Sequence, residues 1–395
     1  MASQPVQFTN RDGITLAGLI DRAPGGERAM ALFAHCFTCT KNLKAATNIA
    51  NALNTAGISV MRFDFTGLGS SEGEFSQTTF SNNVSDLIDA ANWLTEQGSP
   101  PAVLIGHSLG GTAMLQASLE IESAVAVATI GSPATPEHVT HLFADHEADI
   151  IRDGAAEVQL AGRPFTIRRE FIEDLGKHPL AETVHKLRKA LLILHSPIDD
   201  TVTIDNASQL FSAAMHPKSF VSLDHADHLL SNAADSAYAG TVLAGWASRY
   251  LGDASETERN RDQITAITDA SGFTTPIHVG EHTLIADEPA SVGGSDLGPS
   301  PVELMTASLA ACTSMTLKMY ARHKSLPLDE VKVSVTREQT GRGDDQVVTF
   351  RRDIEIEGDL DEAQRERMVE IADKCPVHRT LHGTVEVVNR LIENG

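Results

Sequence analysis

The stretch PAVLIGHSLGGTAML, Pro101 to Leu115, decides the fold. It begins as a short continuous apolar run, which is typical of a buried strand, and continues as a helical pattern that contains several small residues. Ser108 stands between the two parts, in the pattern G-x-S-x-G. This order of strand, turn and helix is the context in which a strained, exposed serine acts as a nucleophile. The alternative is a glycine-rich turn with an idle serine.

A nucleophilic serine needs a histidine as base and a carboxylate that orients the histidine. After the apolar run ALLILH, the segment SPIDDTV offers Asp199 and Asp200, and after SFVSLD the segment HADHLL offers His225 and His228. Both segments are expected at the carboxyl edge of a parallel sheet, where the sites of open α/β folds lie. The helix start is expected to place the N–H of Leu109 at a developing oxyanion.

Residues from about 8 to 252 resemble a serine α/β-hydrolase. The chain order of serine, acid and histidine is that of the family, and LFAHCFTCTK, RFDFTGLGSSEG and SPIDDTV resemble its oxyanion loop, its D-x-R-G-x-G-x-S segment and its acid turn. The resemblance implies a catalytic triad and a backbone oxyanion hole made of Ser108, His228, Asp199, Phe37 and Leu109. It also implies a carboxylic-ester hydrolase for small or medium acyl substrates, which forms an acyl-enzyme and requires no cofactor.

The oxyanion loop departs from the family pattern, which usually has His-Gly where this chain has His35 and Cys36. Cys36 and Cys39 form C-x-x-C, a spacing that redox pairs and half zinc sites share. No second pair is present, so no metal site is expected. In a reducing compartment we expect the four cysteines to be thiols, and this pair to serve packing, with a redox switch as the alternative.

Six β-rich runs alternate with helical patterns such as NVSDLIDAANWLTEQ in the first part of the chain: AMALFAHC, ISVMRFDF, PAVLIGHS, VAVATIGS, ALLILHSP and KSFVSLDH. Continuous apolar strands separated by amphipathic helices predict a mostly parallel sheet with helices on both faces. An insertion at about 132–188 is expected to form a small cap that sets specificity.

The polar segment DASETERNRDQ, residues 253–263, is interpreted as a linker between a domain at 1–252 and a second at 264–395. Downstream, TTPIHVGEHTLIAD, DEVKVSVTREQ and VVTFRRDIEIEGD alternate like strands exposed on one face. SPVELMTASLAACTSMTLKMYARHK is a long helix that is apolar nearly all round in its middle. The pattern predicts an α+β domain with a buried central helix.

Cys312 lies in this helix, and Cys375 lies in ADKCPVHRTLHG. With GGSDLGPSPVELMTASLAACTSM and CPVHRT, residues from about 270 to 392 resemble the OsmC/Ohr family of thiol-dependent peroxidases. The resemblance implies a homodimer in which Cys312 attacks an organic hydroperoxide, Cys375 resolves it as a disulfide, and a dithiol restores both thiols. At the helical position where the family has a glutamate, this chain has Val302, and Glu303 follows it. The arginine that the family carries on an N-terminal strand has no counterpart in TTPIHVGEHTLIAD.

The chain is acidic, with 53 Asp and Glu residues against 31 Lys and Arg residues. This balance disfavours nucleic acid and anionic lipid as partners and predicts a small substrate that is not strongly anionic. No apolar run reaches the length of a membrane-spanning helix, and MASQPVQFTNRDG lacks the pattern of a targeting peptide. We therefore expect a cytoplasmic protein.

Three hypotheses remain open at this point: an esterase with an inactive OsmC-like module for dimerisation or ligand binding, a bifunctional esterase and hydroperoxide reductase, and a nonenzymatic ligand sensor. The intact set of serine, histidine and acid disfavours the sensor. Because the glutamate is displaced, the sequence does not decide between the first two hypotheses.

Overall fold

The computed structural model describes residues 3–24, 27–160, 162–252, 263–268, 272–280, 282–341 and 346–392. The chain divides into two compact units, residues 1–283 and 284–395, which are described separately. The predicted linker lies outside the described residues, except for Gln263.

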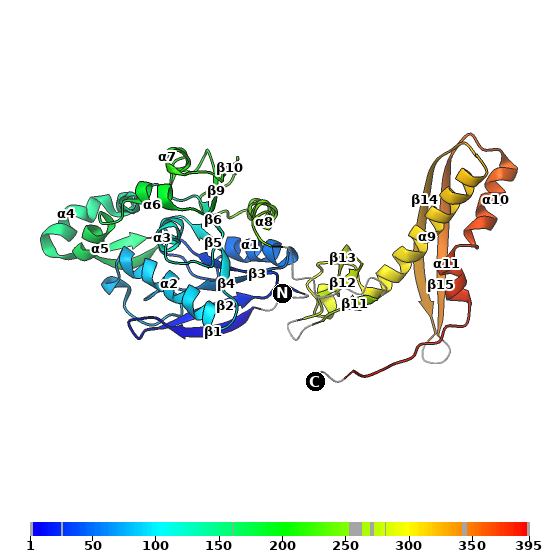
Figure 1. Cartoon of the computed structure of the whole chain (residues 1–395), viewed down its shortest axis with the longest axis horizontal. Coiled ribbons are helices and arrows are strands. Elements are labelled where there is room, and N and C mark those ends of the chain that lie inside the picture. The colour runs from blue at the N-terminus through cyan, green and yellow to red at the C-terminus, as the bar shows by residue number, and fades with distance from the viewer. Residues whose placement is uncertain are drawn as a thin grey trace. The chain divides into compact units, whose positions relative to one another are not determined.

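An eight-stranded sheet forms the centre of the first unit (Figure 1), in the order β1-β2-β4-β3-β5-β6-β9-β10. The parallel strands are the six apolar runs that the sequence predicts: β3 (Ala29–Ala34), β4 (Ile58–Phe63), β5 (Pro101–His107), β6 (Ala126–Ile130), β9 (Ala190–His195) and β10 (Lys218–Ser222). The mostly parallel sheet is therefore confirmed. Antiparallel pairing extends it at one edge through β1 (Gln4–Thr9) and β2 (Thr15–Asp21), which the sequence analysis did not identify.

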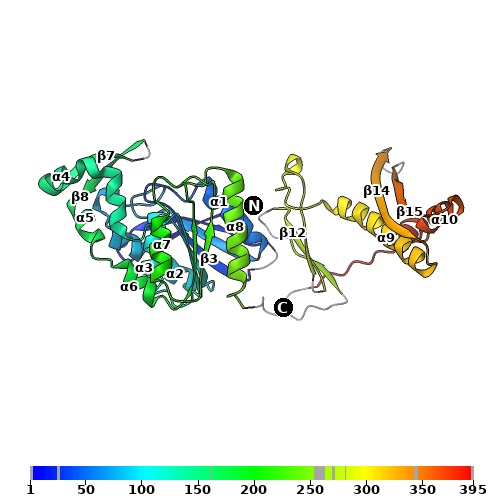
Figure 2. The ribbon, with the colours of Figure 1, turned by 90° about the horizontal axis from the view of Figure 1, so that it is seen from above.

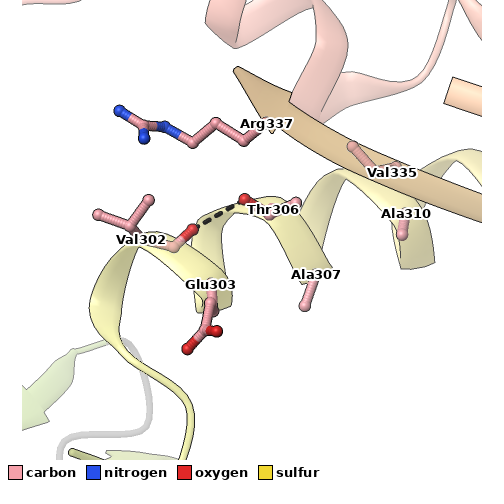
Figure 3. A pocket seen from close by; sticks show the side chains of 7 residues that line it. All are labelled: Val302, Glu303, Thr306, Ala307, Ala310, Val335 and Arg337. Atoms are coloured by element: carbon pink, nitrogen blue, oxygen red, sulfur yellow. Dashed lines mark hydrogen bonds between the residues drawn. The ribbon is translucent and has the colours of Figure 1, made fainter. Parts of the chain in front are cut away.

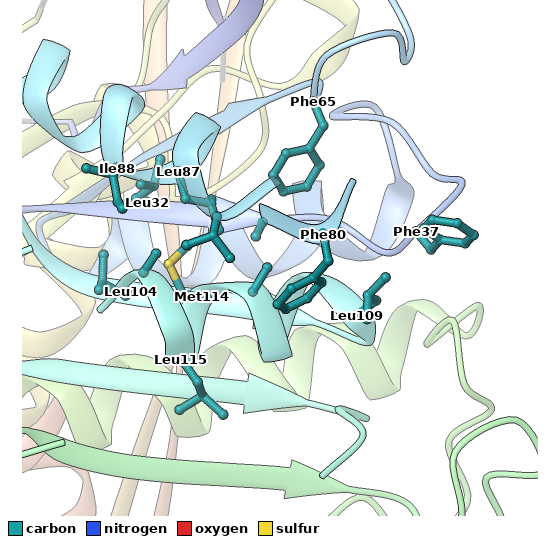
Figure 4. Packing of buried hydrophobic residues seen from close by; sticks show 14 of the residues in the cluster. Leu32, Phe37, Phe65, Phe80, Leu87, Ile88, Leu104, Leu109, Met114 and Leu115 are labelled. Atoms are coloured by element: carbon teal, nitrogen blue, oxygen red, sulfur yellow. The ribbon is translucent and has the colours of Figure 1, made fainter. Parts of the chain in front are cut away.

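Helices cover both faces of this sheet, as predicted (Figure 2). One face carries α1 (Lys44–Thr55) and α8 (Ala233–Ser248), and the other carries α2 (Phe80–Glu96), α3 (Leu109–Ala117) and α7 (Asp205–Ala213). The strands bury side chains in both directions because successive residues of a strand point to opposite faces. Leu32 packs with Leu87 and Met114 on the α2 side (Figure 4), whereas Phe33 packs on the α1 side. Two buried layers therefore hold the central strands rigidly.

The insertion between β6 and β9 contains helices and also a hairpin. Its elements are η2 (Pro136–Phe143), α4 (Ala144–Asp153), β7 (Ala155–Leu160), β8 (Arg163–Arg168), α5 (Arg169–Leu175) and α6 (Leu180–Lys186). Strand β7 pairs antiparallel with β8, and Val158, Ile167 and Phe171 join the hydrophobic cluster beneath α2 and α3. The insertion is therefore packed onto the sheet domain through apolar contacts.

The second unit is built on a long antiparallel pair, β14 (Leu328–Thr340) and β15 (Val347–Gly358), with α9 (Pro301–His323), α10 (Glu362–Ala372) and α11 (Pro376–His382). The short strands β11 (Ile264–Ala266), β12 (Thr275–Val279) and β13 (His282–Ala286) form a separate three-stranded sheet, and the division between the units falls within β13. The predicted α+β pattern is confirmed. Within the described residues, no helix is both long enough and apolar enough to cross a membrane.

Helix α9 is less buried in the single chain than its composition predicts. Leu309, Thr313, Leu317 and Ala321 form its buried stripe, and their spacing of four residues places them on one side of the helix. By contrast, 66% of the Met315 surface and 73% of the Met319 surface are exposed. The expectation of a helix buried all round holds for one face only, because one hairpin and two short helices do not surround it.

Candidate functional site

Ser108 lies at the turn between β5 and α3. Its φ of 56° and ψ of −130° are strained for a residue that has a side chain. A Cβ added to Gly110 would lie 2.2 Å from the carbonyl oxygen of His35, and one added to Gly106 would lie 2.3 Å from the Cα of Gly111. These glycines therefore let the helix approach the strand ends closely enough to present Ser108 at the edge of the sheet.

Ser108, His228 and Asp199 form a continuous set of hydrogen bonds. The Oγ of Ser108 lies 3.0 Å from Nε2 of His228, and the Nδ1 of His228 lies 2.8 Å from Oδ2 of Asp199. The three residues follow β5, β10 and β9, so the parallel sheet itself brings them together at one edge. The neighbouring candidates Asp200 and His225 are both exposed. This geometry suits proton transfer from the hydroxyl to the imidazole.

The carboxylate of Asp199 is held on both of its oxygens. Oδ1 accepts hydrogen bonds from the N–H groups of Thr201 at 2.9 Å and Val202 at 2.8 Å, while Oδ2 accepts from His228. Burial alone raises the pKa of Asp199, but these hydrogen bonds and the charge of His228 outweigh burial and lower the pKa below its ordinary value. Asp199 is therefore ionised at neutral pH, as an orienting group must be.

Two further histidines hold the loops that carry this set. The Nε2–H of His107 donates to the carbonyl of His228 at 2.7 Å, and that of His195 donates to the carbonyl of Val202 at 2.7 Å. Burial lowers the pKa of both histidines, that of His107 to about 4. Both are therefore neutral donors at neutral pH. Neither histidine was predicted from the sequence, although each ends an apolar strand at the edge that carries the candidate site.

The two expected oxyanion donors, Leu109 and Phe37, come from two different segments near Ser108. Leu109 is the first residue of α3, whose leading N–H groups have no partner within the helix. Phe37 lines the same cavity as Ser108 and His228. The side chains of Phe37 and Leu109 both belong to the buried hydrophobic cluster (Figure 4), and this packing fixes the backbone of each residue.

A buried ion network supports the loop that contains Phe37. Asp64 accepts hydrogen bonds from the N–H of Lys41 at 2.7 Å and of Ser70 at 2.8 Å, and it pairs with the Lys41 ammonium. Arg62 pairs with Asp21 at 2.7 Å and donates to the carbonyl of Lys41. The segment RFDFTGLGSSEG therefore anchors the oxyanion loop. The signal in the sequence was an arginine within an otherwise apolar strand.

Cys36 and Cys39 form a disulfide in this loop. The expectation that both are thiols was wrong. The turn closed by the hydrogen bond from Cys39 N–H to the Cys36 carbonyl (3.1 Å) brings their Cα atoms to 5.2 Å, a separation that a disulfide spans. Cys312 and Cys375 are free thiols.

A cavity of about 540 Å³ opens beside Ser108 and His228. This size is within the range of small-molecule sites. One part of its wall is the oxyanion loop, and another comes from the cap insertion: Leu142, Gln159, Leu160 and Arg163. The cap therefore contributes to the surface that a substrate of Ser108 would contact.

In the second unit, a polar cluster surrounds Cys375. Its Sγ accepts hydrogen bonds from the N–H of His378 at 3.2 Å and the hydroxyl of Thr313 at 3.7 Å. Arg352 donates to the Thr313 hydroxyl at 3.3 Å and to Nδ1 of His378 at 3.1 Å. Cys312 adjoins Thr313 on α9 and is partly exposed; both cysteines are described residues, and no disulfide joins them. The structure thus centres this cluster on Cys375.

Arg352 is a cation near the thiol of Cys375, and it was not predicted from the sequence. The family's arginine is expected on a strand before α9, whereas Arg352 lies on β15. The signal was present in VVTFRRDIEIEG, because strand alternation places Arg352 on the same face as Ile354 and Ile356, which pack in the core of this unit.

Glu303 has a structural partner at the start of α9. Its Oε2 accepts hydrogen bonds from the N–H and the hydroxyl of Ser300, both at 2.8 Å, in a capping box. These hydrogen bonds lower the pKa of Glu303. The residue also borders a hollow of about 510 Å³ between α9 and β14 (Figure 3), where Arg337 approaches from the strand. Glu303 therefore caps the helix, and Val302 occupies the position where the family has its glutamate.

Comparison with known proteins matches both parts of the chain. Residues 28–188 match the family model of serine aminopeptidases, S33, and residues 293–388 match that of OsmC-like proteins. The crystal structure of the esterase domain of a Rhodothermus marinus protein is 48% identical in sequence, covers 64% of this chain and 100% of that one, and has a TM-score of 0.54.

More distant relatives share the hydrolase fold. Palmitoyl-protein thioesterase ABHD10 of Rattus norvegicus is 24% identical over 222 residues, which are 53% of this chain and 72% of that protein. The structure of alpha/beta hydrolase domain-containing protein 10 from mouse is 22% identical, with a TM-score of 0.52 over 62% of this chain and 99% of that one. At these identities the structural likeness supports the fold alone.

The lowered pKa of His107 predicts a loss of stability in acid. The unfolded chain binds this proton near pH 6.5 and the folded chain near pH 4, so between these values the unfolded state binds more protons and the free energy of unfolding falls as the pH is lowered. His107→Gln keeps an N–H donor without titrating. Between pH 7.5 and 4.5, the free energy of unfolding of this variant should fall by about 2 kcal/mol less than that of the wild type.

Urea unfolding at the two pH values measures this difference. His185→Gln, on the exposed side of α6, is the matched control and should follow the wild type. An equal acid sensitivity of His107→Gln and the wild type would contradict the buried, neutral state of His107.

Proposed function

Because the chain belongs to the α/β-hydrolase family and carries an OsmC-like domain, we propose that it cleaves carboxylic esters of small or medium acyl substrates with Ser108, His228 and Asp199. The family relatives support an ester-cleaving hydrolase. The roles of these three residues are supported by one observation: Asp199, His228 and Ser108 are joined by hydrogen bonds beside a cavity, and Ser108 is held at φ 56°.

The proposed reaction begins with attack of the Ser108 Oγ on the ester carbonyl. Nε2 of His228 takes the hydroxyl proton, and ionised Asp199 stabilises the imidazolium through Nδ1–H. The N–H groups of Leu109 and Phe37 hold the oxyanion. The His228 proton then passes to the leaving alcohol, and an acyl-Ser108 ester remains. Water, deprotonated by His228, cleaves this ester and releases the acid.

A thioester would react at the same site in the same way, with a thiol as the leaving group. The name of the Rattus norvegicus relative, a palmitoyl-protein thioesterase, supports inclusion of thioesters in the substrate class. Neither substrate requires a cofactor, because the nucleophile, the base and the oxyanion donors all belong to this chain.

We propose that the C-terminal unit joins two chains into a homodimer. Met315 and Met319 lie four residues apart on the exposed side of α9, so their side chains form a continuous apolar strip. The segment after α11 is also apolar and exposed, with exposed fractions of 78% at Val387 and 90% at Leu391. Apolar surface of this kind is typical of an interface.

A second activity, reduction of organic hydroperoxides, is supported by the polar cluster of Thr313, Arg352 and His378 around Cys375. In this proposal the Cys312 thiolate attacks the O–O bond, an alcohol leaves, and Cys312 becomes a sulfenic acid. Cys375 then displaces water to form a disulfide, which an external dithiol reduces. Arg352 donates to Nδ1 of His378, and the backbone N–H of His378 donates to the Sγ of Cys375, so these contacts hold Cys375 in place. The alternative is a unit that only dimerises the chain or binds a ligand.

Hydrolysis of 4-nitrophenyl butyrate tests the proposed catalytic set. Ser108→Ala and Asp199→Asn should each lower kcat/KM by about 10³-fold or more, because one removes the nucleophile and the other the group that orients the base. Asp200→Asn is the matched control and should stay within about twofold of the wild type. Ester hydrolysis by Ser108→Ala at the wild-type rate would contradict the proposal.

The same preparations, with Cys312→Ser and Cys375→Ser, separate the two activities. Consumption of cumene hydroperoxide in the presence of dithiothreitol should depend on both cysteines and be unaffected by Ser108→Ala. No consumption by the wild type would leave the C-terminal unit with dimerisation or ligand binding alone.

Light scattering of the purified chain tests the dimer. The wild type should have twice the chain mass of 42.3 kDa, and the double variant Met315→Lys, Met319→Lys should be monomeric because it places charges in the apolar strip. Met215→Lys, at a methionine of the first unit that is 59% exposed, is the control and should remain dimeric. A monomeric wild type would contradict the proposal.

A further inference from the structure

Arg163 places a positive charge at the wall of the cavity beside Ser108, although the chain is strongly acidic. Arg163 is the only permanently charged residue among the described residues that line it, and none of them is a carboxylate. The whole chain, by contrast, has a formal net charge of −22. A cation at the wall of a substrate cavity attracts an anionic group and orients it.

Contacts with the oxyanion loop and with aromatic rings hold Arg163 in place. Its Nη2–H donates to the carbonyl of Thr38, and its guanidinium lies 5.4 Å from the ring centroid of Phe165. Phe165 packs against Phe75 at 4.9 Å, and Phe75 packs against Phe37 at 5.5 Å. These contacts connect Arg163, on β8 of the cap, to the loop that lines the other side of the cavity.

The charge of Arg163 is not neutralised by the part of the chain that the structure describes. Among the described residues, its guanidinium contacts the carbonyl oxygen of Thr38 and the ring of Phe165. Arg152, in the same cap, instead pairs with Asp149 at 2.6 Å and Asp153 at 2.7 Å. A guanidinium has five N–H donors, so Arg163 keeps donors free for a planar two-oxygen acceptor.

We propose that the substrate of Ser108 carries a carboxylate, in its acyl half or its alcohol half, and that Arg163 binds this group and determines specificity. The inference rests on the proposed ester hydrolysis and adds the substrate class to it. It also revises the expectation, drawn from the net charge of the chain, that the substrate is not strongly anionic. The charge of the cavity wall, and not the sum over a distant surface, is what a bound substrate meets.

Two matched pairs of esters test the proposal and show which half carries the acid. 4-Nitrophenyl hemisuccinate, with the carboxylate in the acyl half, is compared with 4-nitrophenyl methyl succinate, in which a methyl group caps the acid. 4-Acetoxybenzoate, with the carboxylate in the leaving group, is compared with its methyl ester. Each is measured with the wild type, Arg163→Gln and Arg163→Lys, and the ratio of kcat/KM for the free acid to that for the capped ester is recorded.

Arg163→Gln should lower this ratio about tenfold or more for at least one pair, mainly through KM, because hydrogen bonds to a charged group are lost. Arg163→Lys should restore part of it, since the charge remains but the two-pronged geometry does not. Arg168→Gln, at an exposed arginine of the same strand, is the control and should leave the ratio unchanged.

Different results would overturn the carboxylate proposal and the proposed ester hydrolysis. If Arg163→Gln lowers turnover of free and capped esters equally, Arg163 only fastens the cap to the oxyanion loop, and the inference is overturned while the proposed hydrolase stands. If the wild type cleaves none of the four esters, the proposed function fails and the inference fails with it.

Discussion

The close packing of α3 against the ends of β3 and β5 is the constraint on which the arrangement around Ser108 depends. Gly106 and Gly110 have no room for a Cβ, since the first faces the backbone of α3 and the second faces the carbonyl of His35. Only this approach allows the chain to leave the strand, place Ser108 at φ 56° and enter a helix within one residue. The strain at Ser108 is maintained by two buried hydrophobic layers that fix the strand and the helix on either side.

Buried polar groups then position the loops at this edge of the sheet. Asp64, with Lys41, supports the oxyanion loop; His107 holds the backbone of His228; and His195 holds the turn after Asp199. A buried ion pair contributes little net stability when its desolvation is counted. The value of the ion pair and of the two histidine hydrogen bonds is geometric, because each contact determines the position of one loop that carries a residue of the candidate site.

The sequence predicted the parts of the molecule that depend on local periodicity. Six parallel strands, the turn at Ser108 and the long helix α9 all follow from apolar runs and glycine spacing. The order of loops along such a sheet offers Asp199 or Asp200 and His225 or His228 as partners of Ser108, and the resemblance to the α/β-hydrolases selects Asp199 and His228. The disulfide of Cys36 was not predicted, because it depends on the turn geometry of one loop. Arg163 and Arg352 were also missed, since their neighbours come from segments far away in the chain. The exposed face of α9 was missed for a related reason: composition shows that a helix is apolar and does not show how much of it the same chain covers.

The most direct test of the central claim, a nucleophilic Ser108 activated by His228, is the site of reaction with a fluorophosphonate. The reagent forms a bond between phosphorus and the attacking oxygen and releases fluoride. After digestion, mass spectrometry should find one adduct per chain, on the peptide that contains Ser108, and labelling should be slowed strongly in His228→Ala. A wild-type protein that stays unlabelled, or that carries its adduct on another residue, would contradict the account.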